Sequence, residues 1–562
     1  MKFRKLVYIL FLFLFLFLSD LSQIFAQDFN RQRTYDVQHY KIQVKFDREK
    51  QIVFGDTTVS LKPLTDNFNT VELDAAEIKF DSVILENENK ILSYKLDKDR
   101  IIIELGKSFK SKDLIKIRFT YSCKPKKGIY FVPEKKEGRK IVHSEQIWTQ
   151  GEPDEARFWF PSYDFPDDKA TSELFITAKS DENVISNGEF IEQTETGDGT
   201  AVHHYKMMIP HSTYLVSFVI GKYSKTTDLY QNIPLGIYVY PGEESVIPLA
   251  FSDTKDMFRI FENVTGVNYP FNKYDQTIVS NFSFGGMENV TATTFSDKEI
   301  FLARFAHLRG FAIDLVSHEL AHSWFGNLVT CRNWAELWLN EGFATYMEAV
   351  YRGKMYGTGA YTSKIREDAN IYLYGDAVNN YKHGLFNQTA NNTDKLFKYP
   401  NITYNKGSLV IHLLRETVGE DAFWKAVNIY LNRHKFSNVE TNDLKKIMEE
   451  VSGKNLDTFF KQWVHGIGHP KLEIEPVYNS RNKKLNLTIS QTQKGDKVHE
   501  VFSFPMEIFI QTENGEQMER VLVDKRNQTL SFDLTKNPLE IILDKNTKMP
   551  VFEAKINKIK IN

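Results

Sequence analysis

The spacing of apolar residues changes twice along the chain, and this constrains the fold more than any other feature. From residue 35 to 225 apolar and polar residues alternate, as in residues 40–46. Alternation is typical of half-buried strands. Helical spacing takes over after about residue 250, and alternation returns from Lys471. The sequence therefore predicts a multidomain α+β protein in which an all-β sandwich or saddle, a mainly helical domain and a small β-sandwich occupy residues 27–228, 229–470 and 471–562.

The first 26 residues resemble a secretory signal peptide. Three basic residues precede an unbroken apolar run at 6–18, and Ala26 is the expected cleavage residue. The run is shorter than the ~20 residues that a membrane span needs. The chain is therefore expected to be exported, into a periplasm or the extracellular space, without a stable membrane span after cleavage. An uncleaved membrane anchor is the alternative.

Charge and cysteine content limit which partners and which kinds of fold are expected. The chain has 71 basic and 73 acidic residues, a formal net charge of −2, which argues against nucleic acid as a partner. Cys123 and Cys331 are the two cysteines and fall in different predicted domains. Two free thiols are expected, so disulfides do not hold the fold. Both a monomer and an oligomer are compatible with the sequence.

Residues 318–322 read His-Glu-Leu-Ala-His, and they lie in a predicted amphipathic helix at 305–325. Because a helical turn holds about 3.6 residues, His318 and His322 share one face and can reach one ion. Glu319 projects into the same site, where it can accept a proton from a water molecule. A surface helix with a chance pair of histidines is the alternative.

A second helix is predicted to begin near Leu337 and to supply Glu341 as the third ligand. Two histidines, one glutamate and an open position form a catalytic zinc arrangement, whereas structural sites are closed by four protein ligands. One Zn²⁺ per chain is therefore expected. Each ligand imidazole needs a partner on its second nitrogen, and Glu336 or Asn340 is predicted to supply one.

Residues 318–330 and 338–344 resemble the M1 family of zinc aminopeptidases, with the family's spacing between the second histidine and the glutamate. Three other segments agree with this resemblance. Residues 285–289 (Gly-Gly-Met-Glu-Asn) resemble the exopeptidase signature, residues 149–157 the substrate-binding strand, and residues 404–407 the segment of the catalytic tyrosine. Each of these segments alone would be interpreted as an ordinary turn or as packing residues. Their occurrence in the family's order is what makes the resemblance specific.

The resemblance implies a thermolysin-like catalytic domain that removes N-terminal residues from peptides with a free N-terminus. It implies roles for these residues: Glu319 and Tyr404 in catalysis; His318, His322 and Glu341 as metal ligands; and Gln150, Glu152, Gly285, Gly286, Met287, Glu288 and Asn289 in substrate binding. Many members also carry a large helical C-terminal domain. Here about 90 residues with strand-like alternation follow Pro470, so a more open site is expected.

Two other functions are weighed against an aminopeptidase. One is a related hydrolase with endopeptidase or epoxide preference, and the other is a non-catalytic scaffold of the same fold. Glu288 and Glu152 argue against an endopeptidase, because an amide in mid-chain has no ammonium to pair with them. The presence of Glu319 and all three ligands argues against a scaffold.

Overall fold

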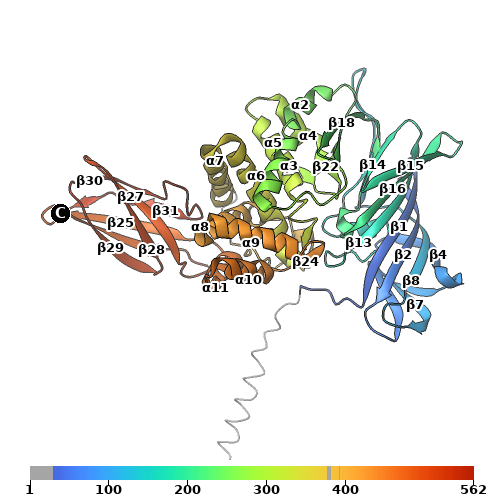
Figure 1. Ribbon diagram of the computed structural model, residues 1–562, viewed down its shortest axis with the longest axis horizontal. Coiled ribbons are helices and arrows are strands. Elements are labelled where there is room, and N and C mark those ends of the chain that lie inside the picture. The colour runs from blue at the N-terminus through green and yellow to red at the C-terminus, as the bar shows by residue number, and fades with distance from the viewer. Residues whose placement is uncertain (1–28, 376–380, 392, 496) are drawn as a thin grey trace, which may run out of the picture.

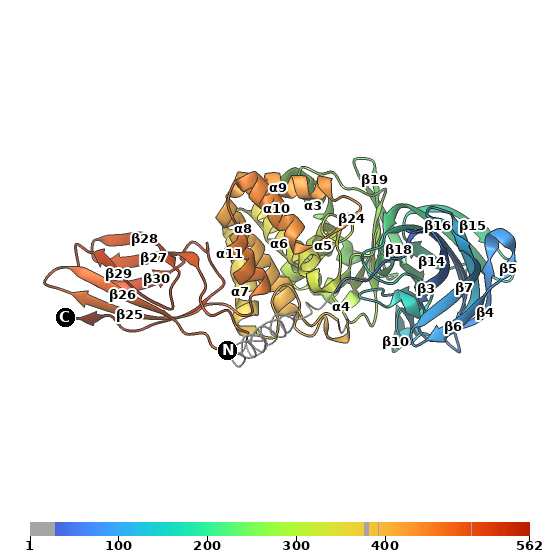
Figure 2. The same cartoon turned by 90° about the horizontal axis from the view of Figure 1, so that it is seen from below.

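Three regions follow one another in a computed structural model, which describes residues 29–375, 381–391, 393–495 and 497–562. The N-terminal and C-terminal β regions lie at opposite ends of a central helical region (Figures 1 and 2). This confirms the predicted order of β, helical and β regions. The predicted signal peptide lies outside the described residues, and export stays a prediction. Within the described part of the chain, no helix has both the length and the apolarity needed to cross a membrane.

The N-terminal region is built on an eight-stranded sheet with the order β15-β16-β13-β1-β2-β8-β4-β5. Neighbouring strands run antiparallel except β1 and β13, which are parallel. In β1, Tyr40, Ile42 and Val44 are buried and Lys41 and Lys45 are exposed, as the alternation predicts. The strands are β1 (Tyr35–Asp47), β2 (Ile52–Pro63), β4 (Ile78–Leu85), β5 (Lys90–Ile91), β8 (Ile115–Cys123), β13 (Ala170–Lys179), β15 (Glu189–Glu195) and β16 (Thr200–His211).

A four-stranded sheet with the order β14-β17-β12-β9 joins this region to the helices. Across the junction, Trp148 Nε1 donates to Ser280 O (3.2 Å) and Asn187 Nδ2 donates to Val290 O (2.7 Å). These bonds fix β12 and the residue after β14 against the central region. The remaining N-terminal strands are β3 (Phe68–Asp74), β6 (Ser93–Asp97), β7 (Arg100–Phe109), β9 (Ile129–Val132), β10 (Lys135–Glu137), β11 (Lys140–His143), β12 (Gln146–Thr149), β14 (Asn183–Ser186) and β17 (Phe218–Gly221).

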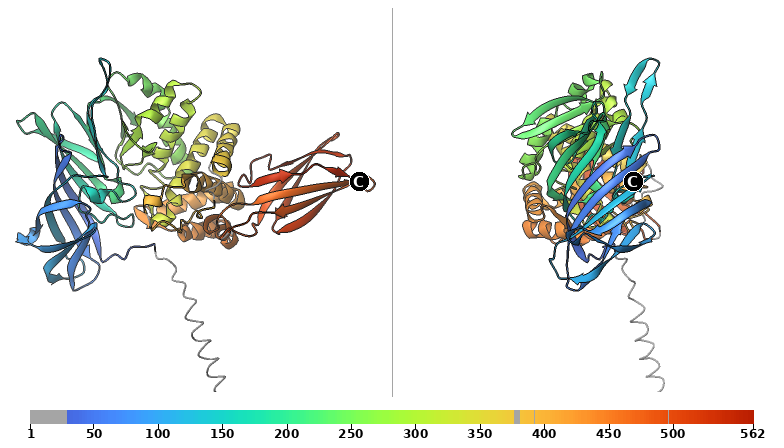
Figure 3. Two further views of the ribbon diagram at one scale, coloured as in Figure 1. Left: turned by 180° about the vertical axis from the view of Figure 1, so that it is seen from behind. Right: turned by 90° about the vertical axis from the view of Figure 1, so that its right-hand side faces the viewer.

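The central region combines a five-stranded sheet, β18-β19-β20-β22-β21, with the helices that carry the candidate site. The sheet begins at Ser224, a few residues before the predicted boundary after 228. Its strands are β18 (Ser224–Tyr230), β19 (Ile233–Val239), β20 (Tyr274–Val279), β21 (Gly286–Met287) and β22 (Ala292–Ser296), and a separate pair is β23 (Val329–Cys331) with β24 (Ser437–Val439). Figure 3 shows this sheet beside the helices from two further sides.

The helices of the described chain include the two that the sequence predicts, at 305–325 and from near Leu337. They are α2 (Ile247–Ala250), α3 (Thr254–Thr265), α4 (Asp297–Phe301), α5 (Arg309–Ala321), α6 (Trp338–Tyr356), α7 (Thr358–Asn370), α8 (Gly407–Val418), α9 (Glu420–Arg433), α10 (Thr441–Ser452) and α11 (Asp457–Phe460). The sequence analysis missed α7. It was also wrong about the character of α5, which is buried on all sides from Val316 to Ala321 rather than amphipathic. Other elements cover α5 completely there, so no face remains for solvent.

The C-terminal region is a β-sandwich of one sheet ordered β29-β26-β25-β31, with β32 also on β25, and a second ordered β28-β27-β30. It contacts the helical region through Gln462 Nε2, which donates to Ser503 O (2.7 Å), and through His412 Nε2 and Thr547 O (2.9 Å). The strands are β25 (Lys471–Asn479), β26 (Lys484–Gln491), β27 (Phe504–Thr512), β28 (Gly515–Val523), β29 (Asn527–Asp533), β30 (Pro538–Leu543), β31 (Glu553–Ile556) and β32 (Lys560–Ile561).

Both cysteines are free thiols, as predicted. Cys123 ends β8 in the N-terminal region and Cys331 ends β23 beside the helices, and both are buried. Burial raises the pKa of Cys123 to about 12, so this thiol is protonated at neutral pH. The fold is therefore held by packing and hydrogen bonds rather than by a disulfide.

Candidate active site

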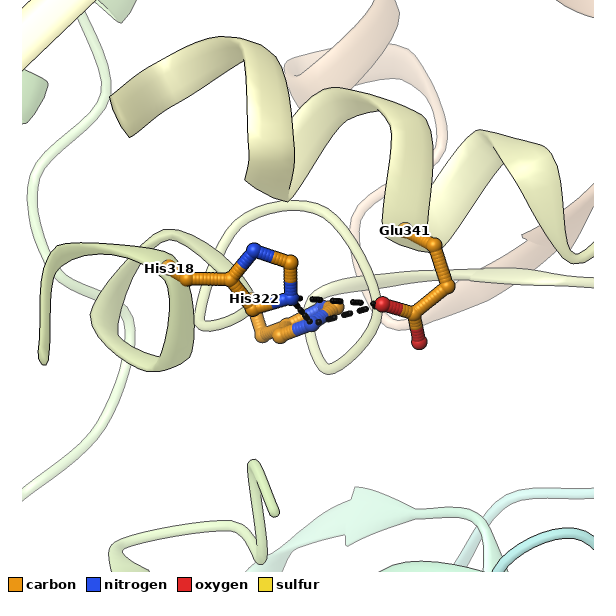
Figure 4. A group of neighbouring side chains, drawn as sticks. All are labelled: His318, His322 and Glu341. Carbon is orange, nitrogen blue, oxygen red and sulfur yellow. Dashed lines mark hydrogen bonds and ion pairs between the residues drawn. The ribbon is translucent and has the colours of Figure 1, made fainter. Parts of the chain in front are cut away.

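The end of one helix and the start of the next bring His318, His322 and Glu341 together. His318 lies in the last turn of α5, His322 directly follows that helix, and Glu341 lies in the first turn of α6. His318 Nε2 is 3.1 Å from His322 Nε2 and 3.3 Å from Glu341 Oε2, and His322 Nε2 is 3.4 Å from that oxygen (Figure 4). The three predicted ligands thus converge on one buried point.

The second nitrogen of each ring shows what this point can bind. His318 Nδ1 lies 2.8 Å from Glu348 Oε1, and His322 Nδ1 lies 2.9 Å from Phe325 O. A carboxylate and a carbonyl only accept hydrogen bonds, so each Nδ1 is the donor and each Nε2 is left to face Glu341. Two imidazole nitrogens and a carboxylate oxygen therefore face one another, and they need a shared cation, either a proton or a metal ion, between them.

The distances fit a small transition metal. Ligand atoms held tetrahedrally at about 2.0–2.1 Å from zinc lie roughly 3.3 Å apart, close to the spacing of these three atoms. The charge around these three atoms also favours a bound cation. Burial lowers the pKa of His318, but Glu341 and Glu348 outweigh it and raise that pKa to about 9. The site therefore carries excess negative charge that a bound cation would neutralise.

The carboxyl group of Glu319 lies beside the three ligands. Ligand atoms of Glu288, Glu319 and His322 are within 4.8 Å of one another. Burial raises the pKa of Glu319 to about 8, and its Oε2 accepts no hydrogen bond from the described residues. A Cβ at Gly286 would lie 2.2 Å from Glu319 Oε1, so the glycine lets β21 lie directly against this carboxyl group. One oxygen of Glu319 is thus available for proton transfer.

Two more carboxyl groups face the ligands from different regions. Glu152 follows β12 of the N-terminal region and Glu288 follows β21. Oxygens of Glu152, Glu288 and Glu341 lie within 4.8 Å of one another, and all three residues are buried. Burial raises the pKa of Glu152, and neighbouring Glu288 raises it further. Buried carboxyl groups at this spacing favour a cation between them, and an ammonium group with three N–H donors is suited to it.

Gln150 and Asn289 lie behind the site rather than on its surface. Gln150 Nε2 donates to Met287 Sδ (3.1 Å), and Asn289 Nδ2 donates to Thr294 Oγ1 (3.2 Å). The cavity of about 620 Å³ is instead lined by the other predicted residues, namely Glu152, Gly285, Gly286, Met287, Glu288, His318, Glu319, His322, Glu341 and Tyr404. Apolar side chains also contribute to its wall, namely Phe284, Phe311, Leu315, Ile371 and Phe397.

Tyr404 lies in η9 (Ile402–Lys406), a π-helical turn just before α8. Its ring is nearly parallel to that of His318, at a centroid distance of 6.0 Å. Burial, and then nearby Glu341, raise the pKa of Tyr404 well above its ordinary value, so the phenol stays protonated. Gly407 packs backbone to backbone against Gly342, the neighbour of Glu341. This glycine contact brings the tyrosine segment close to the ligand helix.

Comparisons with known proteins agree with this arrangement. The description "Peptidase M1 N-terminal domain" matches residues 36–215, and "Peptidase family M1 domain" matches residues 249–463. The chain belongs to peptidase family M1. It is 34% identical over 341 residues to aminopeptidase N of Streptomyces lividans, covering 58% of this chain and 39% of that protein. It is 28% identical over 516 residues to probable aminopeptidase 2 of Sulfurisphaera tokodaii, which covers 91% of this chain and 63% of that protein.

A third M1 relative is aminopeptidase 2 of Candida albicans, with 27% identity over 472 residues, or 82% of this chain and 50% of that protein. The chain thus spans about half the length of the curated relatives it matches. The two matched ranges together contain every residue predicted for the site.

The predicted partners of the ligand imidazoles are wrong. Glu336 accepts a hydrogen bond from Thr441 Oγ1, and Asn340 accepts one from the backbone N–H of Cys331 (3.0 Å). Both side chains are turned away by these bonds, and Glu348 and the Phe325 carbonyl take the imidazole N–H groups instead. Glu348 lies seven residues after Glu341, two helical turns along the same face of α6. That spacing was a signal in the sequence that could have identified it.

We expect the Gly407→Ala substitution to separate α8 from α6. The new Cβ would lie 2.8 Å from Gly342 Cα, and backbone cannot move aside as a side chain can. Overpacking of this kind costs about 1–3 kcal/mol. Thermal unfolding should show a lower Tm, and peptidase assays a lower kcat. Gly359→Ala in α7 is the matched control, because its Cβ meets open space. Equal effects of the two substitutions would contradict the role of this contact.

We expect the Lys406→Met substitution to stabilise the protein near neutral pH. Lys406 is buried, donates to Gly466 O (3.4 Å), and burial lowers its pKa to about 7. Between that value and ~10.5 the unfolded chain binds the proton that the folded chain lacks, so this group destabilises the fold below ~10.5. The gain in unfolding free energy should be a few kcal/mol at pH 7.5.

Urea unfolding from pH 7 to 9.5 checks this expectation. The gain from Lys406→Met should shrink by about 1.4 kcal/mol per pH unit above 7, because proton uptake by the unfolded lysine favours unfolding less as pH rises. Exposed Lys461 provides the control, and Lys461→Met should change little at any pH. A gain that is independent of pH would show that Lys406 is charged in the folded protein.

Proposed function

We propose that this protein is a zinc-dependent aminopeptidase that hydrolyses the N-terminal peptide bond of peptides. The observation that carries the proposal is the pair of buried carboxyl groups, Glu152 and Glu288, within 4.8 Å of ligand Glu341. A free α-ammonium would pair with them by charge-assisted hydrogen bonds, which fixes the first peptide carbonyl beside His318 and His322. The two-helix ligand set is that of a thermolysin-like catalytic domain, as the resemblance implies.

Zinc bound by His318, His322 and Glu341 would supply Lewis-acid chemistry, polarising the carbonyl and making a water molecule more acidic. Glu319 Oε2 takes the proton of the attacking water and later gives it to the leaving amine. The raised pKa of Glu319, about 8 without an ion, falls when a cation is bound nearby. The carboxylate is then the working base at neutral pH.

Tyr404 acts on the other side of the carbonyl. Its raised pKa keeps the phenol protonated, so the hydroxyl donates a hydrogen bond as negative charge develops on the carbonyl oxygen. Loss of one donor of this kind typically costs about 10²–10³ in rate. The position of Tyr404 near the His318 ring supports this role.

The same observations support the alternative functions less well. An endopeptidase or epoxide hydrolase brings no ammonium to the Glu152 and Glu288 pair, which would then stay buried without a cation. A non-catalytic scaffold needs neither Glu319 nor Tyr404 at the metal site. Peptides with a free N-terminus are the substrates that we propose for this protein, whose export also stays a proposal, and assembly into oligomers stays open to measurement.

We expect hydrolysis of aminoacyl-anilide substrates with a free amine and none of their N-acetylated forms. Acetylation removes the charge that Glu152 and Glu288 recognise. Glu288→Gln should reduce kcat/KM for free-amine substrates by roughly 10- to 100-fold, mainly through KM, because a hydrogen bond to a charged group contributes about 1.5–3 kcal/mol. Steady-state kinetics on paired substrates measure both effects. Comparable rates on the two forms would rule out the aminopeptidase assignment.

We expect Glu319→Gln to retain the metal and lose turnover by about 10²–10⁴-fold, because the amide cannot accept the proton. Zinc content is measured by atomic emission on the purified variant, and kcat in the same preparation. His322→Ala is the contrasting variant, which should lose the zinc itself. Full activity of Glu319→Gln would remove this residue from the reaction.

A further inference from the structure

In the wall of the cavity, Lys364 lies between the carboxylates of Glu348 and Asp368, and Lys364 and Glu348 are among its lining residues. Lys364 Nζ is 2.9 Å from Glu348 Oε2 and 2.7 Å from Asp368 Oδ1. The side chains of these three residues are 7%, 12% and 0% exposed. Glu348 lies on the predicted helix α6, whereas Lys364 and Asp368 lie on α7, which was not predicted. An ammonium group held in this way has little freedom to move.

Each end of this ion-pair chain reaches a different part of the site. At one end Glu348 Oε1 contacts His318 Nδ1 at 2.8 Å. At the other end Asp368 accepts hydrogen bonds from Asn405 Nδ2 (3.0 Å) and Ser408 Oγ (2.9 Å). Asn405 is the neighbour of Tyr404, and Ser408 lies in the first turn of α8. One continuous set of contacts thus runs from a ligand imidazole to the tyrosine segment.

We propose that Lys364 is a positioning residue that couples the orientation of His318 to the placement of Tyr404. The proposal rests on the proposed function, which gives these two residues their roles. Through Glu348, Lys364 holds the His318 ring with its Nε2 toward the metal position. Through Asp368, the same ammonium holds the backbone turn from which Tyr404 projects. The metal ligand and the oxyanion donor therefore keep a fixed separation.

Electrostatics makes the lysine hard to replace. Glu348 and Asp368 are both buried, and without Lys364 two carboxylates would face one another across a site that is already rich in negative charge. Glu348 would then lose the contact that fixes its carboxylate and turn away from Asp368, which weakens its bond to His318. Partners of ligand histidines typically contribute 10- to 100-fold to metal affinity.

A nearby ion-pair set provides a matched control. Arg352 of α6 contacts Asp314 of α5 and, at 3.0 Å, Glu367 of α7. It also joins α6 to α7, yet neither of its partners contacts a ligand or the tyrosine segment directly. Arg352→Met therefore measures what the loss of a partly buried cation beside the same cavity does without those contacts.

The test compares Lys364→Met, Asp368→Asn and Arg352→Met in the full chain. Zinc dissociation constants are measured by competition with a chelator, without substrate, and kcat and KM at saturating zinc. Lys364→Met should raise the zinc Kd 10- to 100-fold and lower kcat at least tenfold with little change in KM. Asp368→Asn, which is isosteric, should likewise raise the zinc Kd and lower kcat. Arg352→Met should lower Tm and leave zinc Kd within about twofold.

A double-mutant cycle between Glu348→Gln and Asp368→Asn tests the coupling itself. Asp368 touches no ligand, so its effect on zinc affinity should vanish once Glu348 is changed. Independent effects would overturn the proposal, as would equal zinc affinities of Lys364→Met and Arg352→Met. A rise in KM alone would instead make Lys364 a substrate contact. If Lys364→Met does not fold, the cycle decides the question.

The two proposals fail separately. Zinc affinity is read without any substrate, so an unaltered protein that binds zinc but cleaves no free-amine substrate refutes the aminopeptidase function only. An active aminopeptidase in which Asp368→Asn changes neither zinc Kd nor kcat refutes the coupling only.

Discussion

The convergence of three hydrogen-bond acceptors on one buried point is the constraint on which the central region depends. His318, His322 and Glu341 come from a helix end and a helix start, and neither end could place them alone. They need a shared cation between them, either a proton or a metal ion. The fold holds them in place by giving each imidazole Nδ1–H an acceptor, by burying α5 from Val316 to Ala321 and by packing Gly342 on Gly407. The stability of the scaffold therefore offsets the strain at the site.

The acidic side chains of the cavity come from two regions of the chain, and the two groups have different proposed roles. The proposed metal position draws on α5 and α6, whereas the proposed ammonium position needs Glu152 from the N-terminal region beside Glu288. That pairing depends on bonds across the junction, such as Trp148 to Ser280 and Asn187 to Val290. A shift between the regions would leave the metal site intact and disturb recognition of the substrate. Chemistry and substrate selection thus rest on different contacts.

Local sequence patterns predicted the order of the three regions and the segments that carry the site, because period and motif spacing are local properties. The failures have a common cause in tertiary contacts. The buried face of α7 includes Lys364 and Asp368, so its apolar period is broken and the helix was missed. Helix α5 was expected to be amphipathic, but its neighbours enclose it. Glu336 and Asn340 were expected to face the imidazoles. Instead Glu336 accepts a hydrogen bond from Thr441, which is distant in the sequence, and Asn340 accepts one from the backbone of Cys331.

The C-terminal β-sandwich braces the helices that support the site without lining the cavity, whose wall lies between residues 152 and 405. Arg366 of α7 donates to Thr547 Oγ1 (2.9 Å) and Lys545 O (2.8 Å), and His412 of α8 contacts Thr547 O. These are the two helices joined on their inner side through Asp368 and Ser408. One turn of the sandwich thus holds, from outside, the spacing that Lys364 and Asp368 hold from inside. Because a tyrosine displaced by about 1 Å loses much of its catalytic effect, such bracing bears on rate as well as on stability.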